Sequence, residues 1–201
     1  MTTDNRAFEE MLKPAVERVQ KKQPEEISEN AGVYYNKNNS EFEIITLDQK
    51  ITVKYPSCEI TEELEGWHTL LLLHYMDIAD GTPLAGEWVT FGSLKDGLVR
   101  GMKFDHTAEE DLQNIFHGKT QSEMEDICRK SGGRLVEGRA DLCAEFSVFP
   151  KYPILLNLWM EDEEFPLTGK FFADKSADHY LTMEDTVTAG CVLLDRLKNF
   201  C

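Results

Sequence analysis

Residues 142–159 read LCAEFSVFPKYPILLNLW, and this stretch decides which fold class the sequence predicts. Every second residue from Leu142 to Val148 is apolar, which is the period of a strand that buries one face. Pro150 and Pro153 then bracket a turn, and an apolar run follows at 154–159. The stretch therefore predicts two strands of a sheet that are joined by a turn.

The residues that follow this stretch extend the sheet and add a helix. The segment from Phe165 to Phe172 predicts a third strand. Thr182 can cap a C-terminal helix, because Asp185 follows three residues later at the spacing of a capping box. The inner face of this helix is predicted to carry Val187, Cys191, Leu194 and Leu197.

The chain before residue 142 predicts mostly helix. Pro14 should kink or restart an amphipathic helix over residues 5–22, because proline cannot donate the helical hydrogen bond. Thr61 can cap a longer central helix over 62–79. The remaining elements follow from turn residues and alternation: a helix at 24–32, a three-stranded meander within 33–55, a short strand near 88–91, and polar helices at 107–117 and 120–130 that each begin at capping-box spacing.

These elements predict one α+β domain over residues 1–201. A mixed or antiparallel sheet is expected to pack against the central helix and the C-terminal helix. Trp67 lies on the apolar face of the central helix and Trp159 ends an apolar strand, so both are expected to be buried. His68 and His74 lie on different faces of the central helix, so they are expected to be packed or hydrogen-bonded rather than to share a metal ion.

Composition sets limits on the function. The chain has 201 residues, of which 41% are hydrophobic and 29% charged, and these fractions are typical of a globular protein. The net charge of −16 repels nucleic acid and anionic membranes, so neither is expected as a partner. Five cysteines without a Cys-x-x-Cys pair, and a first twenty residues without an apolar run, predict a reducing, cytoplasmic location.

Several short stretches carry a family resemblance. The C-terminal third contains WMEDEEFP at 159–166, FAD at 172–174 and HYLTMED at 179–185, and earlier stretches are LLLHY at 71–75 and GEW at 86–88. Together they resemble the pattern of the domain of unknown function 3786 family over nearly the whole chain. The resemblance implies an uncharacterised domain, found mainly in anaerobic bacteria and archaea, with some relatives beside corrinoid and methyl-transfer proteins. Some relatives also carry a cysteine cluster of the iron–sulfur type, which this chain lacks. The resemblance assigns no catalytic residue.

The segment 159–185 concentrates acidic side chains, with eight carboxylates against two lysines. Charge of this density needs either solvent or a cation, and the sequence leaves both open. Residues 161–164 can form a solvated turn between strands or part of a binding site. The residues selected as a candidate binding site are Trp159, Asp162, Glu164 and His179.

Residues 174–185 also resemble a calcium-binding loop, because oxygen-bearing side chains fall at positions 1, 3, 5, 9 and 12 of that template. His179 replaces the glycine that makes the sharp turn of such loops, and the shorter Asp185 replaces the final glutamate. If calcium binds, its ligands are the side chains of Asp174, Ser176, Asp178 and Asp185 and the carbonyl of Tyr180. The alternative is a turn in which the carboxylates of Asp174 and Asp178 accept hydrogen bonds from backbone amides.

Two functions remain open from the sequence. Phosphate-binding glycine loops, a Gly-x-Ser-x-Gly elbow and a catalytic triad are absent from the sequence, which favours a non-catalytic binding or accessory protein. The resemblance implies that a corrinoid or methyl-transfer protein is its partner. The alternative is a carboxylate- or hard-metal-dependent enzyme that uses the segment 161–178, with Asp162, Glu164 and Asp174 as acid, base or ligands. Carboxylates that converge in a deep pocket favour the enzyme, and acids that point outward favour partner binding.

Overall fold

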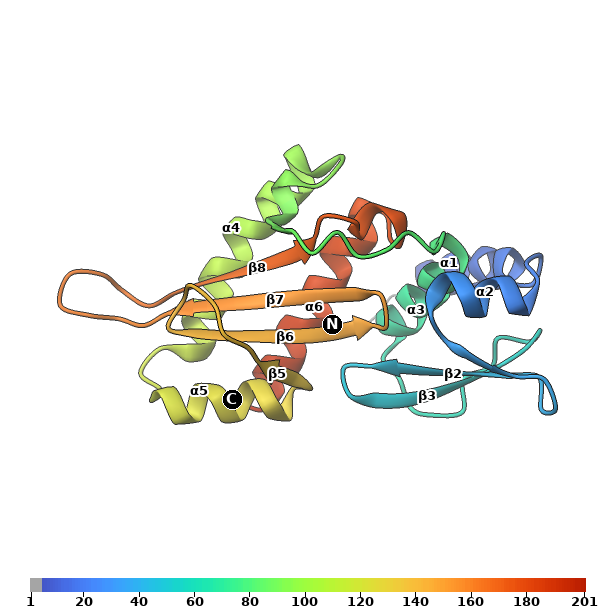
Figure 1. The fold of residues 1–201 in the computed structure, drawn as a ribbon, viewed down its shortest axis with the longest axis horizontal. Helices are drawn as coiled ribbons and strands as arrows, with labels where there is room; N and C mark the ends of the chain where they lie inside the picture. Colours follow the sequence, from blue (N-terminus) through green and yellow to red (C-terminus); the bar gives the residue numbers. More distant parts are fainter. Residues whose placement is uncertain (1–4) are drawn as a thin grey trace.

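In a computed structural model that describes residues 5–201, these residues form six α-helices and two antiparallel sheets (Figure 1). The helices are α1 (Asn5–Val19), α2 (Pro24–Ala31), α3 (Gly66–Ile78), α4 (Gly97–Phe116), α5 (Gln121–Lys130) and α6 (Met183–Asn199). The strands are β1 (Tyr34–Asn36), β2 (Glu41–Thr46), β3 (Gln49–Lys54), β4 (Trp88–Val89), β5 (Gly133–Leu135), β6 (Leu142–Phe149), β7 (Tyr152–Trp159) and β8 (Thr168–Asp174). The fold class is therefore α+β, as the sequence predicts.

The five-stranded sheet has the order β4-β8-β7-β6-β5, and the stretch 142–159 supplies its centre. Strands β6 and β7 form an antiparallel hairpin, in which Ala144 pairs with Leu156 and Phe146 with Ile154. These four side chains are completely buried. They occupy the sheet face that is covered by α4 and α6, which lie together on one side of the sheet in Figure 1. No helix of residues 5–201 covers the opposite face of the sheet, and we call it the open face (Figure 1).

The smaller sheet, of order β1-β2-β3, is the predicted meander. It is joined to the larger sheet through Thr46 at the end of β2. The Thr46 hydroxyl donates to the Val148 carbonyl at 2.6 Å and lies 2.8 Å from Nε2 of His68. His68 is thus hydrogen-bonded inside the core, and its burial lowers its pKa to about 4.

Helix α3 is central, as predicted, and Tyr75 connects it to two other parts of the molecule. The Tyr75 hydroxyl donates to the Ala31 carbonyl at 2.6 Å and accepts from the Lys151 amide at 3.0 Å. Its ring stacks on Phe149 with centroids 4.5 Å apart. The buried hydroxyl therefore has both a donor and an acceptor partner, which a buried polar group requires.

None of the helices in residues 5–201 is long and apolar enough to cross a membrane.

Helix boundaries differ from the sequence prediction at three places. Helix α1 runs through Pro14 without a break, and α3 begins at Gly66 rather than near residue 62. Helix α4 begins at Gly97, ten residues before Thr107. The Thr107 hydroxyl donates to the Lys103 and Phe104 carbonyls within the helix, so the predicted capping box there is wrong.

The predicted cap at Thr61 is also wrong, because α3 begins after Glu65 and no side chain caps it. The capping predictions at Thr120 and Thr182 are confirmed. Thr120 and Glu123 form a reciprocal capping box at the start of α5. At the start of α6 the Thr182 hydroxyl accepts from the Asp185 amide at 3.2 Å. The expectation of buried tryptophans is wrong, because Trp67 and Trp159 are both half-buried. Trp67 packs edge-on against Phe8 at the surface of the core, and Trp159 lies on the open face of the sheet.

Candidate functional site

A groove of ≈ 700 Å³ lies on the open face of the five-stranded sheet. Its volume is within the range of small-molecule sites. Strands β6, β7 and β8 form its floor, and two chain segments that lie on the open face form its walls. The residues that line it are Gly86, Glu87, Trp88, Val136, Glu137, Gly138, Arg139, Cys143, Glu145, Leu155, Asn157, Trp159 and Phe172.

Strand register places the floor residues relative to one another. Leu155 pairs with Phe172 on one side and with Glu145 on the other, so these three side chains cross the sheet in a row. Asn157 and Trp159 follow on the same face of β7, because alternate residues of a strand share a face. The floor is therefore apolar at Leu155 and Phe172, with the Glu145 carboxylate and the Asn157 amide beside them.

The first wall is the loop 136–141 between β5 and β6. The Val136 amide donates to the Cys143 carbonyl at 3.0 Å, and Asp141 Oδ2 accepts from the Met160 amide at 2.8 Å. Gly138 lies directly over Cys143, since a Cβ atom at Gly138 would be 2.3 Å from the Cys143 sulfur. A side chain at Gly138 would therefore lift the wall away from the sheet.

The second wall consists of residues 86–88 at the end of the segment 80–88, and the carboxylate of Asp174 holds this segment in place. Asp174 Oδ1 accepts from the Ala85 amide at 2.8 Å, and Oδ2 accepts from the Gly86 amide at 2.7 Å. Oδ1 also accepts from the Ser176 amide at 3.0 Å and from the Ser176 hydroxyl at 2.6 Å. Burial alone would raise the pKa of Asp174, but the hydrogen bonds from Ser176, Ala85 and Gly86 outweigh it and lower the pKa. Trp88 stands next to Asp174 in the register of β4 and β8, so this carboxylate positions the tryptophan.

His179 holds the beginning of the same segment. Its Nδ1 atom lies 2.7 Å from Asp80 Oδ2 and 3.1 Å from the Thr82 hydroxyl. The Tyr180 hydroxyl donates to the Thr82 carbonyl. The hydrogen bond with Asp80 raises the pKa of His179, and the same contact lowers the pKa of Asp80 to about 2. His179 therefore acts in the structure as a positioning residue for the segment 80–88.

This pair gives a pH prediction. Because the pKa of His179 is raised, its contribution to the stability of the folded state is complete below the ordinary pKa of 6.5. This stability is lost as the pH rises through the raised pKa. Because the pKa of Asp80 is lowered, its contribution to stability is complete above the ordinary pKa of 3.8 and is lost as the pH falls towards 2. We expect an NMR titration of the His179 ring to give a pKa above 6.5, and Asp80→Asn to shift it back towards 6.5. An unchanged His179 pKa in Asp80→Asn would contradict the assignment to Asp80. The raised pKa would then have to come from Asp178, which acts in the same direction more weakly.

The electrostatics of the groove are nearly balanced. Glu87 pairs with Lys175 at 3.0 Å, and Glu145 pairs with Arg134 at 3.0 Å. Glu137 and Arg139 add one charge of each sign at the wall. Among the described residues no histidine lines the groove, and the buried Cys143 thiol lies 3.9 Å from the Ala140 carbonyl. The lining therefore lacks a nucleophile next to a base, which covalent catalysis requires.

The structure separates the residues of the predicted binding site. Trp159 lines the groove, whereas Asp162 and Glu164 lie in the exposed loop between β7 and β8. Asp162 Oδ1 accepts from the Glu164 and Phe165 amides, each at 2.8 Å, so this carboxylate orders the turn. Strand β8 lies between this loop and His179, and seven strand residues span about 20 Å. The acidic segment therefore does not form one cluster.

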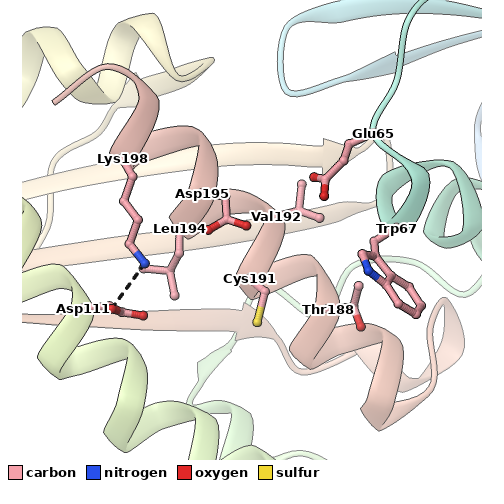
Figure 2. A pocket seen from close by; sticks show the side chains of 9 residues that line it. All are labelled: Glu65, Trp67, Asp111, Thr188, Cys191, Val192, Leu194, Asp195 and Lys198. Carbon is pink, nitrogen blue, oxygen red and sulfur yellow. Dashed lines mark ion pairs between the residues drawn. The ribbon is translucent and has the colours of Figure 1, made fainter. Parts of the chain in front are cut away.

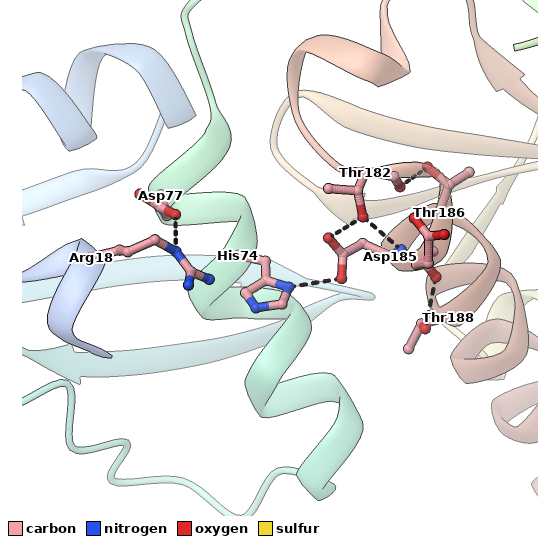
Figure 3. A network of polar contacts seen from close by, with 8 residues as sticks. Arg18, His74, Asp77, Thr182, Asp185, Thr186 and Thr188 are labelled. Carbon is pink, nitrogen blue, oxygen red and sulfur yellow. Dashed lines mark hydrogen bonds and ion pairs between the residues drawn. The ribbon is translucent and has the colours of Figure 1, made fainter. Parts of the chain in front are cut away.

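The structure also gives the proposed calcium ligands other partners. Asp174 accepts the four hydrogen bonds described above, and Asp178 is exposed. Asp185 lies 2.8 Å from Nδ1 of His74 and accepts from the Thr182 hydroxyl at 2.7 Å (Figure 3). Within residues 5–201 no group of three or more His, Cys, Asp or Glu side chains is placed to hold a metal ion. The geometry of Asp174 matches the alternative of a capped turn.

We therefore expect millimolar calcium to leave the melting temperature unchanged. A ligand that binds only the folded state raises the melting temperature by mass action, so an occupied site would be visible. Differential scanning calorimetry with and without calcium measures this, with magnesium as the control for ionic strength. A saturable rise that is specific to calcium, and that disappears in Asp178→Asn, would restore the loop as a metal site.

A second, smaller pocket of ≈ 290 Å³ lies between α6, α4 and the start of α3 (Figure 2). Cys191 is exposed there, not inward as the sequence predicts, because α6 turns this residue towards the pocket beside Thr188. Partial burial raises the pKa of the Cys191 thiol, and nearby Asp195 and Asp111 act in the same direction. Lys198 pairs with Asp111 at 3.3 Å. A thiol with a raised pKa and no histidine in the pocket lining is not an activated nucleophile.

The sequence selects Trp159, which lines the groove, but gives no sign of the groove itself. It selects Asp174 as a metal ligand or catalytic carboxylate, whereas this carboxylate accepts from the Ala85 and Gly86 amides. Asn157 was not selected, although it breaks the apolar run of β7 and therefore signals a polar group on one face. Trp88 belongs only to the short predicted strand near 88–91 and to the family resemblance, and Gly138 carries no local motif. These residues meet through the pairing of strands that are far apart in sequence.

The described residues thus form an α+β fold with a groove on the open face of its larger sheet. The family described as Domain of unknown function (DUF3786) matches residues 23–196, and the chain belongs to this family. No curated protein and no solved structure matches the chain.

Proposed function

We propose that this protein is a non-catalytic binding or accessory protein whose ligand occupies the groove on the open sheet face. The observation that carries the proposal is the lining of the groove. It combines the apolar side chains of Trp88, Trp159, Phe172 and Leu155 with the amide of Asn157 and with charged side chains. Aromatic side chains together with placed polar groups are common in ligand sites. The paired charges and the missing nucleophile–base pair favour binding over catalysis.

The positions of the carboxylates weigh against the enzyme alternative. Asp162 and Glu164 stand at one end of β8, and Asp174 stands at the other end. A general acid and a general base must both reach one substrate, at hydrogen-bond distance or through one water. The separation by a whole strand prevents this, and the Asp174 carboxylate is already committed to backbone amides.

The proposed cytoplasmic location and the proposed metabolic partner are supported by other observations than the groove. All five cysteines are free thiols, which supports a reducing, cytoplasmic location. The family resemblance is the ground for placing the ligand or partner in corrinoid or methyl-transfer metabolism. Co-purification from a native lysate of an anaerobe tests this part, and repeated recovery without a corrinoid or methyl-transfer protein would count against it.

The groove itself is tested by NMR on protein labelled with ¹⁵N-tryptophan. The chain has three tryptophans, and only Trp88 and Trp159 line the groove, whereas Trp67 lies in the pocket of Figure 2. A library of small planar fragments should shift the indole signals of Trp88 and Trp159 and leave Trp67 unchanged. Leu155→Arg, which places a charge on the floor, should abolish these shifts. A library in which no fragment shifts either groove tryptophan would overturn the proposal.

A further inference from the structure

We infer that the ligand of the groove is a flat, uncharged ring with a lactam edge, in which a ring N–H stands beside a ring carbonyl. This inference rests on the proposed function, because it specifies the ligand class of the same groove. It is carried by the side-chain amide of Asn157 together with the aromatic side chains near it.

The Asn157 amide is the uncharged polar group of the groove floor, and its oxygen has no hydrogen-bond partner. Its Oδ1 atom is buried and makes no hydrogen bond, a state shared within residues 5–201 only by the hydroxyl of Ser131. Buried polar atoms of native proteins are nearly always hydrogen-bonded, so a buried acceptor that lines a groove indicates a missing donor. That donor is an N–H or O–H group of the ligand.

The neighbours of Asn157 in the sheet are engaged elsewhere. Cys143 and Lys170 stand directly opposite Asn157 on the two adjacent strands. The Cys143 sulfur lies 3.9 Å from the Ala140 carbonyl, and the Lys170 ammonium is directed to Glu109 on α4, 4.0 Å away. Neither neighbour therefore satisfies the amide oxygen.

The amide also determines the shape of the matching group. A side-chain amide presents an acceptor oxygen and an NH₂ donor side by side in one plane. A lactam edge presents a donor N–H and an acceptor carbonyl with the same spacing, so the two form a pair of parallel hydrogen bonds. Such a pair also fixes the orientation of the ring, which a single hydrogen bond does not.

The surroundings of Asn157 favour an aromatic ring over an aliphatic one. Trp159 follows it on the same strand face, and Phe172 lies diagonally across on β8. Aromatic side chains stack on planar rings in offset or edge-on arrangements. The ligand ring can thus meet the amide with its edge and contact aromatic side chains with its faces.

The charge of the protein excludes a phosphorylated form of such a ring. The charged side chains that line the groove are nearly balanced by cations, whereas the whole chain has a net charge of −16. The field of the whole chain repels a phosphate group. The structure therefore assigns the free ring, or the ring on an uncharged substituent, as the ligand.

The test uses matched pairs of rings on the ¹⁵N-tryptophan protein and in isothermal titration calorimetry. Uracil, hypoxanthine and lumazine present a lactam edge, whereas 1,3-dimethyluracil has the same ring with both N–H groups blocked. We expect the lactam rings to shift Trp159 and not Trp67, and to bind roughly 10-fold or more tightly than the blocked ring, as a bidentate pair of hydrogen bonds implies. Uridine monophosphate should bind more weakly than uridine.

Variants locate the effect at Asn157. Asn157→Leu should bind uracil and 1,3-dimethyluracil equally, and Asn39→Leu, at an exposed turn, should keep the preference of the parent protein. The comparison of ligands on the unchanged protein decides the question even where Asn157→Leu does not fold. Equal shifts of Trp159 by both rings would overturn the lactam inference and leave the binding groove intact. The absence of shifts with every ring, including the fragment library, would overturn both.

Discussion

Asp174→Ala is expected to lower the free energy of unfolding by about 3 kcal/mol and to abolish ligand binding in the groove. Asp174 is 4% exposed, and its carboxylate accepts hydrogen bonds from the Ala85, Gly86 and Ser176 amides. Removal of the carboxylate leaves these donors without a charged acceptor, and hydrogen bonds to charged groups are the more valuable ones. The segment that carries Trp88 then loses its attachment to β8.

Urea denaturation measures the loss of stability, and Asp178→Ala is the matched control. Asp178 is an exposed aspartate four residues further along, so its replacement should change the unfolding free energy by no more than about 0.5 kcal/mol. Because the pKa of Asp174 is lowered in the folded protein, its contribution to stability is present above the ordinary pKa of 3.8. This contribution is lost as the pH falls through the pKa of the folded protein. The parent protein should therefore lose more stability than Asp174→Ala on acidification below about pH 4. A loss below about 1 kcal/mol at neutral pH would show that the wall is held by other contacts.

The strands of this fold were predictable because their information is local. The alternation from Leu142 to Val148 gives β6 and its buried face, and the turn before Ile154 gives the partner strand. The meander β1-β2-β3 follows from the same kind of pattern. Strand order was not predictable, because it depends on which faces are covered by helices from other parts of the chain.

Helix α4 shows where local reasoning fails. Its first ten residues contain Gly97 and Gly101, which read as loop residues because glycine disfavours a helix. The helix forms there because these glycines admit the backbone of Phe91 at close range. At the start of α4, the side chains of Leu98 and Val99 are apolar but exposed, which also breaks the amphipathic pattern of the helix.

The candidate site also depends on contacts with distant parts of the chain, which local sequence patterns do not predict. The acidic residues of the C-terminal third suggested a metal or catalytic cluster, yet Asp174, His179 and Asp185 each bind a segment about 90 or more residues earlier in the chain. A carboxylate that accepts backbone amides and one that binds a metal look alike in sequence. Only the approach of the segment 80–88 to the end of β8 distinguishes them.

The second large change in the free energy of unfolding is expected for Gly101→Ala. In an ordinary helix interior this change stabilises by about 1 kcal/mol, because alanine has the higher helix propensity. Here the added Cβ atom would lie 2.4 Å from the Phe91 carbonyl oxygen and 2.6 Å from its carbon. Both atoms belong to the backbone, so the contact cannot be relieved by a change of rotamer.

The turn at Phe91 cannot move without further losses. The Phe91 and Gly92 amides donate to the Asp105 carboxylate at 3.1 and 2.8 Å. The Phe91 ring stacks on Phe104 with centroids 4.9 Å apart. A displacement of the turn therefore weakens these contacts as well, and overpacking of such a site typically costs about 1–3 kcal/mol.

We expect Gly101→Ala to reduce the unfolding free energy by about 2 kcal/mol, with a sign opposite to that of helix propensity. Gly66→Ala is the matched control, because a Cβ atom at this first residue of α3 would meet the Phe8 ring at an ordinary 3.4 Å. That variant should be neutral or slightly stabilised in the same urea titration. If Gly101→Ala were as stable as Gly66→Ala, the turn would not be held against α4, and the early start of this helix would need another cause. The sign of the change thus tests whether α4 owes its first turns to contact with Phe91 rather than to its own sequence.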